Sequence, residues 1–188
     1  MELFDKAITF AVKAHSGDYR KGTQTPYIVH PIEAAAIVAT MTNDENVLAG
    51  AVLHDVVEDT DYTVDDIRNE FGEEVAKLVA SESEDKRRDR PAEATWKIRK
   101  QETLEHLKGA TIETKMITLG DKLSNIRAIY RDYSTIGDRL WERFNQKDKA
   151  EHAWYYKGIA ECLKELSDTF AYQEYIELVN KVFNEEEK

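Results

Sequence analysis

Cysteine is almost absent from this chain, since Cys162 is the only one among its 188 residues. A single cysteine excludes an internal disulfide and leaves no cysteine-based zinc site, so Cys162 is expected to be a small buried hydrophobe. Proline and glycine are also scarce, with three prolines and eight glycines. Few residues therefore break a helix, and no stretch alternates apolar and polar residues as a half-buried strand does.

Positive charge is outnumbered, because 26 Lys and Arg face 37 Asp and Glu, giving a net charge of −11. Binding to a nucleic-acid backbone scales with the cations offered to phosphates, so broad nucleic-acid binding is excluded. Long apolar runs are missing as well. The first apolar residues are spaced by threes and fours between charges, which predicts an amphipathic helix and neither a signal peptide nor a membrane span. We therefore expect a cytoplasmic protein with no membrane partner.

Helical spacing recurs along almost the whole chain, where apolar residues return every three or four positions. A chain of 188 residues with 41% apolar composition can bury a sizeable core. The sequence therefore predicts an all-α fold, a compact single-domain bundle of about eight helices. After the N-terminal helix, the periodic segments are 32–41, 47–57, 67–79, 96–107, 112–130, 140–144, 152–166 and 171–183.

Helix starts carry chemical signals. Pro31 suits a first helical position, because its missing N–H would have no partner there. Thr42 followed by Glu45, and Thr63 followed by Asp66, have the spacing of capping boxes. The segments 18–26 and 81–91 are rich in turn-forming or charged residues and are expected to be loops or frayed helix ends.

Four ionisable side chains stand within six positions directly after the apolar run 47–53: His54, Asp55, Glu58 and Asp59. On a helix, His54 and Glu58 lie one turn apart on one face, and Asp55 and Asp59 do so as well. Close carboxylates repel one another and are costly to bury. The cluster therefore predicts a compensating cation or substrate, and a divalent metal ion is the simplest choice.

Two further candidate ligands are flanked by apolar residues, His30 just before Pro31 and Asp121 within the stretch 117–126. Two imidazoles and two carboxylates form a mixed nitrogen and oxygen set that suits Mn²⁺, Fe²⁺ or Zn²⁺. Adjacent side chains on a helix point about 100° apart, so one ion can bind both His54 and Asp55 only if it lies between the two side chains. The other two ligands would arrive from other helices.

Five strings resemble, in order and context, the HD superfamily of metal-dependent phosphohydrolases. The finer similarity is to the (p)ppGpp hydrolase domain of RelA/SpoT proteins and to stand-alone small alarmone hydrolases. It covers about the first 130 residues and implies one HD-type domain over 1–188, with a core over about 1–130 that helices of 131–188 complete. The strings are AHSGDYRK at 14–21, PYIVHP at 26–31, HDVVEDT at 54–60, FG at 71–72 and GDKLSNIR at 120–127.

The resemblance implies removal of the 3′-pyrophosphate from guanosine tetraphosphate or pentaphosphate to leave GDP or GTP, usually with Mn²⁺. A carboxylate beside the metal would activate or deliver water, and Glu58 is the better candidate for the general base. A guanidinium can pair with phosphate in a fork and stack on a purine. The family pattern assigns metal binding to His30, His54, Asp55 and Asp121, catalysis to Glu58 and Asp59, and substrate binding to Arg20, Lys21 and Asn125.

Two alternatives stay open, because a metal centre dictates attack on a phosphoester more firmly than it dictates the base. One is a phosphohydrolase of another 2′- or 3′-phosphorylated nucleotide, such as NADPH. The other is a non-catalytic sensor that binds the alarmone. In each case the partner is a small anionic nucleotide, and a homo-oligomer is also left open.

Two further features have no assigned role. The basic segment 86–100 is expected to form solvated helix faces, unless it folds over the site and steers an anionic substrate. The aromatic sets at 141–144 and 154–156 are expected to lie in the core or at an interface, with closure of a nucleotide pocket as the alternative.

Overall fold

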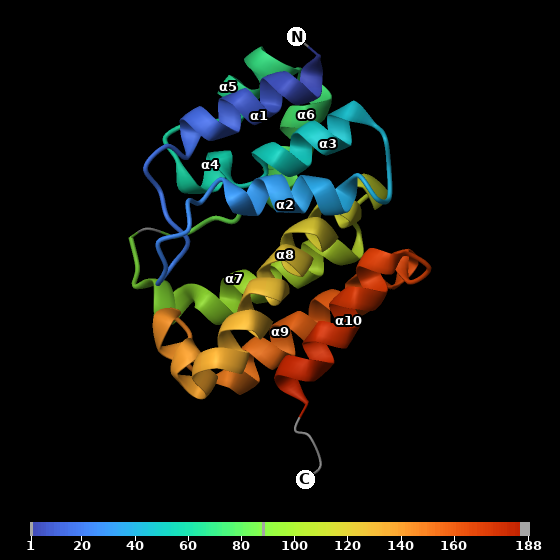
Figure 1. The fold of residues 1–188 in the computed structure, drawn as a ribbon. Helices are drawn as coiled ribbons and strands as arrows, with labels where there is room; N and C mark the ends of the chain where they lie inside the picture. The colour runs from blue at the N-terminus through green and yellow to red at the C-terminus, as the bar shows by residue number, and fades with distance from the viewer. Residues whose placement is uncertain (1, 88, 185–188) are drawn as a thin grey trace. The chain divides into compact units, whose positions relative to one another are not determined.

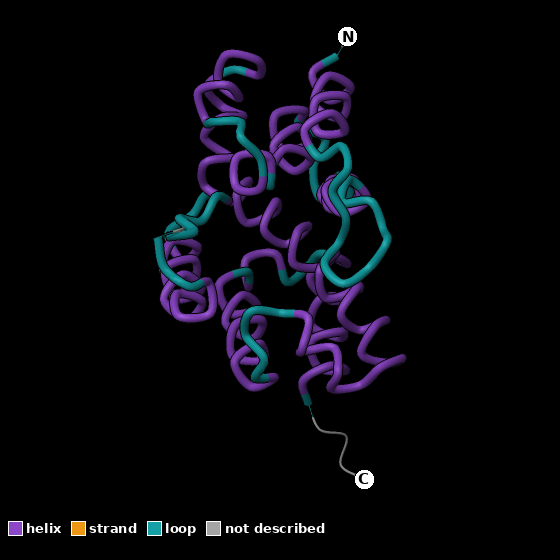
Figure 2. Tube along the Cα trace, turned by 90° about the vertical axis from the view of Figure 1, so that its left-hand side faces the viewer, coloured by secondary structure: helices purple, strands orange, loops and turns teal. Residues whose placement is uncertain are grey.

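The computed structural model describes residues 2–87 and 89–184, and this part of the chain is almost entirely helical (Figure 1). Figure 2 shows helices joined by loops, with no strand in the described part. The predicted all-α fold class is confirmed. The elements are α1 (Leu3–Ala14), α2 (Val29–Val38), α3 (Glu45–Leu53), α4 (Val56–Asp59), α5 (Val64–Phe71), α6 (Glu73–Glu82), α7 (Ala92–Lys108), α8 (Ile112–Ile136), the 3-10 helix η1 (Gly137–Arg143), α9 (Lys149–Cys162), the 3-10 helix η2 (Lys164–Leu166) and α10 (Phe170–Phe183).

The chain divides into two compact units and passes between them three times, the last time within α8. The first unit contains Met1–Glu84 and Thr111–Asp121. The second contains Asp85–Ala110 and Lys122–Lys188. A single domain over 1–188 stays a prediction.

Helix α3 is central to the first unit, where it packs against α1, α2 and α6 (Figure 1). Its sequence explains this position, because the buried side chains of α3 run almost without interruption from Val47 to Leu53. A helix that is apolar on all sides needs neighbours on all sides. The buried residues Ala7 and Ala11 present small side chains on the packed face of α1. The C-terminal end of α3, which leads into His54, is therefore fixed inside the core.

Helix α9 packs against α7 and α10 in the second unit. Aromatic rings fill this core: Trp141 stacks on His152 with ring centroids 5.0 Å apart and on Phe183 at 5.8 Å. Trp141, Tyr155 and Tyr156 are all buried, as expected for core aromatics. Within the described residues, every helix is too short or too polar to cross a membrane.

One of the two predicted capping boxes is confirmed. The Thr63 hydroxyl accepts a hydrogen bond from the Asp66 N–H at 3.2 Å, and the Asp66 carboxylate accepts one from the Thr63 N–H at 2.7 Å. The box predicted at Thr42 is wrong. Asp44 caps α3 instead and accepts a hydrogen bond from the Asn46 N–H at 2.8 Å. Asp is among the strongest N-cap residues, and it stands directly before the first helical residue.

Two predicted helices are each split in two, so the described residues contain more helices than expected. The segment 67–79 is interrupted at Gly72, whose φ of 90° is a conformation that glycine adopts without steric cost. The segment 47–57 is interrupted at His54 and Asp55. Cys162 is half-buried rather than buried, and its thiol lies 3.6 Å from the carbonyl oxygen of Leu104.

Candidate metal centre

His30 is positioned by the first turn of α2. The helix begins at Val29, so Pro31 occupies the third position and not the predicted first. That position still suits proline, because the first backbone N–H groups of a helix have no partner within it. The preceding loop is closed by a hydrogen bond of 2.9 Å from the Tyr27 N–H to the Asp18 carbonyl. His30 is thus held at the start of the helix, where it is buried.

His54 and Asp55 lie in a turn between two helices, because α3 ends at Leu53 and α4 begins at Val56. The prediction of one continuous helix over 47–57 is wrong. Asp55 has φ of −91° and ψ of −7°, a sparsely populated region of backbone conformation where many active-site residues lie. The Asp59 N–H still donates to the Asp55 carbonyl at 2.9 Å, so the predicted spacing of one turn between these two residues is retained.

Asp121 is brought against α2 by the glycine before it. A Cβ atom added to Gly120 would lie 2.7 Å from the carbonyl oxygen of Ala34 and 2.7 Å from Cγ2 of Val38. Only a residue without a side chain allows α8 to approach the α2 backbone this closely. Ala34 lies one turn after His30 on α2, so this approach places Asp121 beside His30.

Two imidazoles and two carboxylates converge at this point of the first unit. Nε2 of His30 lies 3.2 Å from Oδ1 of Asp121 and 3.4 Å from Oδ2 of Asp55. Nε2 of His54 lies 3.1 Å from Oδ2 of Asp55 and 3.8 Å from Oδ1 of Asp121. Two ligands that are each about 2.1 Å from one ion lie about 3.0 to 4.2 Å apart. His30, His54 and Asp121 offer ligand atoms that all lie within 4.8 Å of one another, as residues around one ion would. Asp55 lies beside both imidazoles, and its place in the ligand set stays a prediction.

The hydrogen bonding of His54 also fits a metal. Its Nδ1 lies 2.7 Å from the carbonyl oxygen of Ala51, and since a carbonyl only accepts, Nδ1 must carry a proton. Its Nε2 is buried and makes no hydrogen bond within the described residues. Nε2 instead faces the carboxylates of Asp55 at 3.1 Å and Asp121 at 3.8 Å. Metal-binding histidines typically donate their other ring N–H to such a carbonyl, so this arrangement suits a divalent cation.

The electrostatics of the cluster favour a cation. Burial disfavours the charged imidazole of His54, but the carboxylates of Asp55 and Asp121 outweigh burial and raise the pKa of His54 to about 10. Burial likewise opposes the charged form of Asp55, yet His54 and His30 hold the pKa of Asp55 well below its ordinary value. The carboxylates thus create a negative potential at His54 Nε2 that a proton or a metal ion can offset.

The two residues predicted to be catalytic lie on α4, directly after the His54–Asp55 turn. Glu58 is half-buried, and its Oε2 accepts a hydrogen bond from the Glu84 N–H at 3.3 Å. Asp59 is exposed and is connected to the cluster through Tyr27. The Tyr27 hydroxyl lies 2.9 Å from Oδ2 of Asp59 and 2.6 Å from Oδ2 of Asp55. The catalytic roles themselves stay predictions.

Tyr27 is the residue that the assignment from sequence missed. Its ring centroid lies 4.9 Å from that of His15 and 5.9 Å from that of His30. Burial and the nearby carboxylates of Asp55 and Asp59 raise the pKa of Tyr27 above its ordinary value. A signal existed, because Tyr27 precedes His30 by three residues at a helix start, and residues three apart share one face of a helix.

Of the three predicted substrate-binding residues, Arg20 has a contact beside the cluster. Its guanidinium carbon lies 5.6 Å from the centre of the Tyr27 ring. Lys21 follows it in the loop and is exposed. Asn125 comes four residues after Asp121 along α8 and belongs to the second unit. Contact with a substrate stays a prediction for all three.

The basic segment 86–100 belongs to the second unit, and several of its cations are paired within that unit. Arg87 lies 2.6 Å from a carboxylate of α7, and Lys97 pairs with Glu151. Arg99 is buried, so the expectation of a solvated face is wrong for that residue. Arg88 lies outside the described residues.

Comparisons with known proteins identify the family. The family model described as "HD domain" matches residues 7–147. A Mus musculus protein named guanosine-3′,5′-bis(diphosphate) 3′-pyrophosphohydrolase MESH1 is 32% identical over 183 residues, covering 96% of this chain and 92% of its own. The relative of the same name from Drosophila melanogaster is 36% identical over 127 residues, covering 66% of this chain and 68% of its own. A similarly named Aquifex aeolicus enzyme is 33% identical over 132 residues, 69% of this chain, which spans only 18% of that enzyme.

Solved structures give the same result. A structure described as a metazoan ortholog of SpoT that hydrolyzes ppGpp superposes with a TM-score of 0.77 and 26% identity, covering 96% of both chains. The Listeria monocytogenes EGD-e protein lmo0812 gives a TM-score of 0.73 and 32% identity, covering 83% of this chain and 99% of its own. The match of the family model to most of the chain, together with the fold, confirms that this chain belongs to the HD-domain family.

Proposed function

We propose that this protein is a metal-dependent hydrolase that removes the 3′-pyrophosphate of guanosine tetraphosphate or pentaphosphate. The observation that carries this proposal is the convergence of His30, His54 and Asp121 within 4.8 Å of one another, with Asp55 beside both imidazoles. The metal centre defines the class of chemistry, hydrolysis of a phosphoester. The nucleotide is inferred from the mouse relative named for this reaction, which is similar over 96% of the chain.

His30, His54, Asp55 and Asp121 would hold the ion. Imidazole and carboxylate donors suit Mn²⁺, our first choice, and also accommodate Fe²⁺ or Zn²⁺. A divalent ion held there supplies positive charge that lowers the pKa of a water molecule and offsets the charge on the phosphoryl group under attack.

Two carboxylates divide the proton transfers. Glu58 would act as the general base that takes a proton from the attacking water, since it is half-buried on α4, directly after the His54–Asp55 turn. Water adds across the bond between the ribose 3′-oxygen and the pyrophosphate. A proton must then reach the departing 3′-oxygen, and the exposed Asp59 would transfer this proton. The products are GDP or GTP and pyrophosphate.

Substrate binding would rest on local positive charge, because the net charge of the chain is −11. Arg20 can pair with a phosphate in a fork or stack on the guanine, and Lys21 adds a second cation in the same loop. Asn125 would contact the ribose.

A product analysis tests this proposal. The full chain with Mn²⁺ is incubated separately with guanosine tetraphosphate, NADPH and a 3′-phosphoadenosine compound, and the products are separated by ion exchange. Asp121→Asn keeps the shape of a ligand but removes its charge. Glu105→Gln is the matched control, since it removes a carboxylate from an exposed position on α7.

We expect the wild type and Glu105→Gln to release GDP and pyrophosphate from guanosine tetraphosphate faster than they act on the other two compounds. Asp121→Asn should release neither product. Faster turnover of NADPH or of the adenosine compound would refute guanosine tetraphosphate as the substrate and support the alternative nucleotide. Tight binding of guanosine tetraphosphate without any product would support the sensor instead.

We also propose a cytoplasmic location, since guanine nucleotides are made and used there. A homo-oligomer stays a prediction. Light scattering of the purified chain would measure its molar mass and decide between a monomer of 21.7 kDa and a multiple of it.

A further inference from the structure

The Tyr27 hydroxyl lies between two carboxylates. Its oxygen is 2.6 Å from Oδ2 of Asp55 and 2.9 Å from Oδ2 of Asp59. Both distances are in the range of good hydrogen bonds between oxygens. A phenol carries one proton at neutral pH, and a carboxylate only accepts, so the hydroxyl can satisfy one carboxylate fully at a time. Tyr27 thus connects a predicted metal ligand to a predicted catalytic residue.

The ring of Tyr27 is fixed from several directions. His15 and His30 lie at centroid distances of 4.9 Å and 5.9 Å, and the guanidinium of Arg20 lies 5.6 Å from the ring centre. His15 is buried, and neither of its ring nitrogens makes a hydrogen bond within the described residues. Burying such a ring without partners has a free-energy cost. The planes of the His15 and Tyr27 rings are inclined by 36° and those of Tyr27 and His30 by 78°, so these rings pack at an angle on two sides of Tyr27.

One oxygen of Asp55 faces three groups at once. Its Oδ2 lies 3.4 Å from Nε2 of His30, 3.1 Å from Nε2 of His54 and 2.6 Å from the Tyr27 hydroxyl. A carboxylate that binds a metal needs its rotation fixed, and a hydrogen bond from outside the ligand set commonly supplies this. Tyr27 is placed to do so for Asp55.

We propose that Tyr27 is a positioning residue whose hydroxyl orients Asp55 for metal binding and Asp59 for proton transfer, a role that rests on the proposed function above. The same hydroxyl can turn from one carboxylate to the other without moving the ring. Tyr27 therefore couples the metal centre to the proton-transfer residue, and its loss should affect both metal affinity and turnover.

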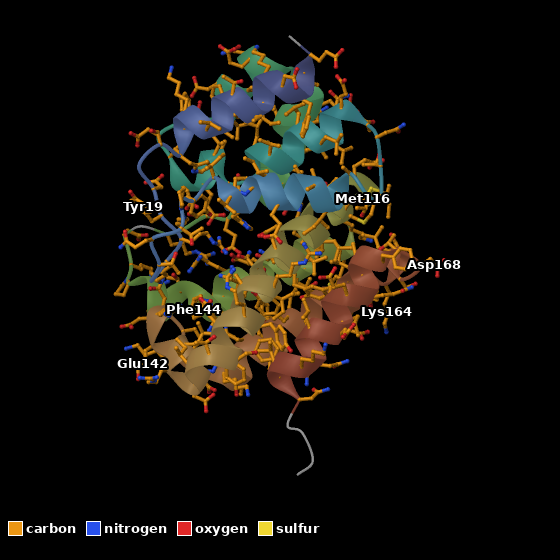
Figure 3. The ribbon with its side chains drawn as sticks, viewed as in Figure 1. Tyr19, Met116, Glu142, Phe144, Lys164 and Asp168 are labelled. Atoms are coloured by element: carbon orange, nitrogen blue, oxygen red, sulfur yellow. The ribbon has the colours of Figure 1, made fainter. Side chains whose placement is uncertain are left out.

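The test replaces Tyr27 with Phe, which removes only the hydroxyl oxygen. Tyr19→Phe is the matched control, because it removes the same atom from a side chain in the same loop (Figure 3). Tyr19 is 57% exposed. Mn²⁺ affinity is measured without substrate by competition with a fluorescent chelator. We expect Tyr27→Phe to bind Mn²⁺ about 10- to 100-fold more weakly, as for other hydrogen-bond partners of metal ligands. Tyr19→Phe should match the wild type.

Turnover at saturating Mn²⁺ provides a second measurement. We expect Tyr27→Phe to lower kcat more than it raises KM, because Asp59 loses its orientation after the metal is restored. A double-mutant cycle with Asp59→Asn identifies the route: if the hydroxyl acts through Asp59, adding Tyr27→Phe to Asp59→Asn should change kcat less than about twofold. Independent, multiplicative losses of kcat would overturn that route.

The inference is overturned if Tyr27→Phe, folded by circular dichroism, binds Mn²⁺ within twofold of the wild type. The metal measurement also separates this inference from the proposed function. A wild type that binds Mn²⁺ but cleaves no guanosine tetraphosphate refutes the proposed substrate, and the effect of Tyr27→Phe on Mn²⁺ affinity can still be measured.

Discussion

Asp121 and Glu58 are both carboxylates of the first unit, but their surroundings predict different roles. Asp121 lies 3.2 Å from one imidazole of the cluster and 3.8 Å from the other. Its replacement takes away one of the four predicted ligands, so Asp121→Ala should weaken Mn²⁺ binding by more than about 100-fold, beyond the loss typical of an outer partner. Turnover should be lost together with the metal. Elemental analysis after gel filtration measures the bound Mn²⁺, and full retention would refute the ligand assignment.

Glu58 should show the opposite behaviour. Its Oε2 accepts a hydrogen bond from the Glu84 N–H, and it is not among the four predicted ligands. Glu58→Gln keeps the size of the side chain but cannot take a proton, so kcat should fall about 10²- to 10⁴-fold. Mn²⁺ affinity should stay within about threefold of the wild type, since no ligand is removed. A variant that loses Mn²⁺ would place Glu58 in the ligand set and leave the general base unidentified.

The buried side chain of His152 should make the folded protein less stable in acid. Burial lowers the pKa of His152 below its ordinary value, and Lys100 adds to this, while the hydrogen bond to the Gln146 carbonyl and the carboxylates of Asp148 and Glu151 act against it. Between the unfolded pKa of about 6.5 and the lower folded value, the unfolded chain binds more protons, so stability falls as the pH falls through this window. Above it, both states are neutral and the contribution is constant.

The measurement is the free energy of unfolding by urea for wild type and His152→Phe, from about pH 7.5 to about pH 5, with chelator present. Phe keeps the ring that stacks on Trp141 but loses the hydrogen bond of 2.9 Å to the Gln146 carbonyl. We expect a roughly constant loss of about 1 kcal/mol near neutral pH that shrinks as the pH falls. The buried His15 is present in both proteins, so its titration cancels. Parallel pH profiles would show that His152 does not contribute to the acid sensitivity.

At the scale of elements, the approach of α8 to α2 depends on Gly120. An ordinary Gly-to-Ala change inside a helix stabilises by about 1 kcal/mol. Here the new Cβ would lie 2.7 Å from the Ala34 carbonyl oxygen, a backbone atom that cannot move alone. Overpacking of this kind costs about 1–3 kcal/mol, so Gly120→Ala should destabilise the protein on balance and weaken Mn²⁺ binding by moving Asp121 from His30.

Gly109→Ala is the control for this change, because the nearest atom to its added Cβ is 4.0 Å away. Thermal unfolding and Mn²⁺ competition of both variants check the prediction. A Gly120→Ala protein that is more stable than the wild type and binds Mn²⁺ normally would contradict the prediction. It would show that α2 and α8 can move apart at little cost in free energy.

The same elements show what sequence can predict. The convergence of His30, His54 and Asp121 was predictable, because each stands as a polar residue beside an apolar run, in strings that resemble a known family. The break between α3 and α4 was not, because apolar spacing continues through it and only the backbone angles of Asp55 reveal the turn. The effect of Gly120 was not predictable, because it acts on a helix far away in sequence and such contacts leave no periodic signal. Tyr27 did leave a local signal in its spacing from His30, but its hydrogen bond to Asp55 joins residues far apart in sequence.

At the scale of the whole molecule, the four predicted ligands come from three separate parts of the first unit: α2, the turn after α3, and α8. One ion bound by all of them would tie these parts together. A ligand that binds only the folded state stabilises it by about 2.7 kcal/mol at 100 times its dissociation constant. For a chain of this length, that corresponds to a rise in Tm of about 5–10 °C.

We therefore expect Mn²⁺ to raise the Tm of the wild type by this amount, and a chelator to reverse the rise. Hydrogen exchange should slow most in α2, α3 and the part of α8 before Asp121, while α10, which belongs to the second unit, should change little. Asp121→Ala is the control, since it should show no rise at the same Mn²⁺ concentration. An equal rise in that variant would mean that Mn²⁺ stabilises the protein from a site other than the four converging side chains.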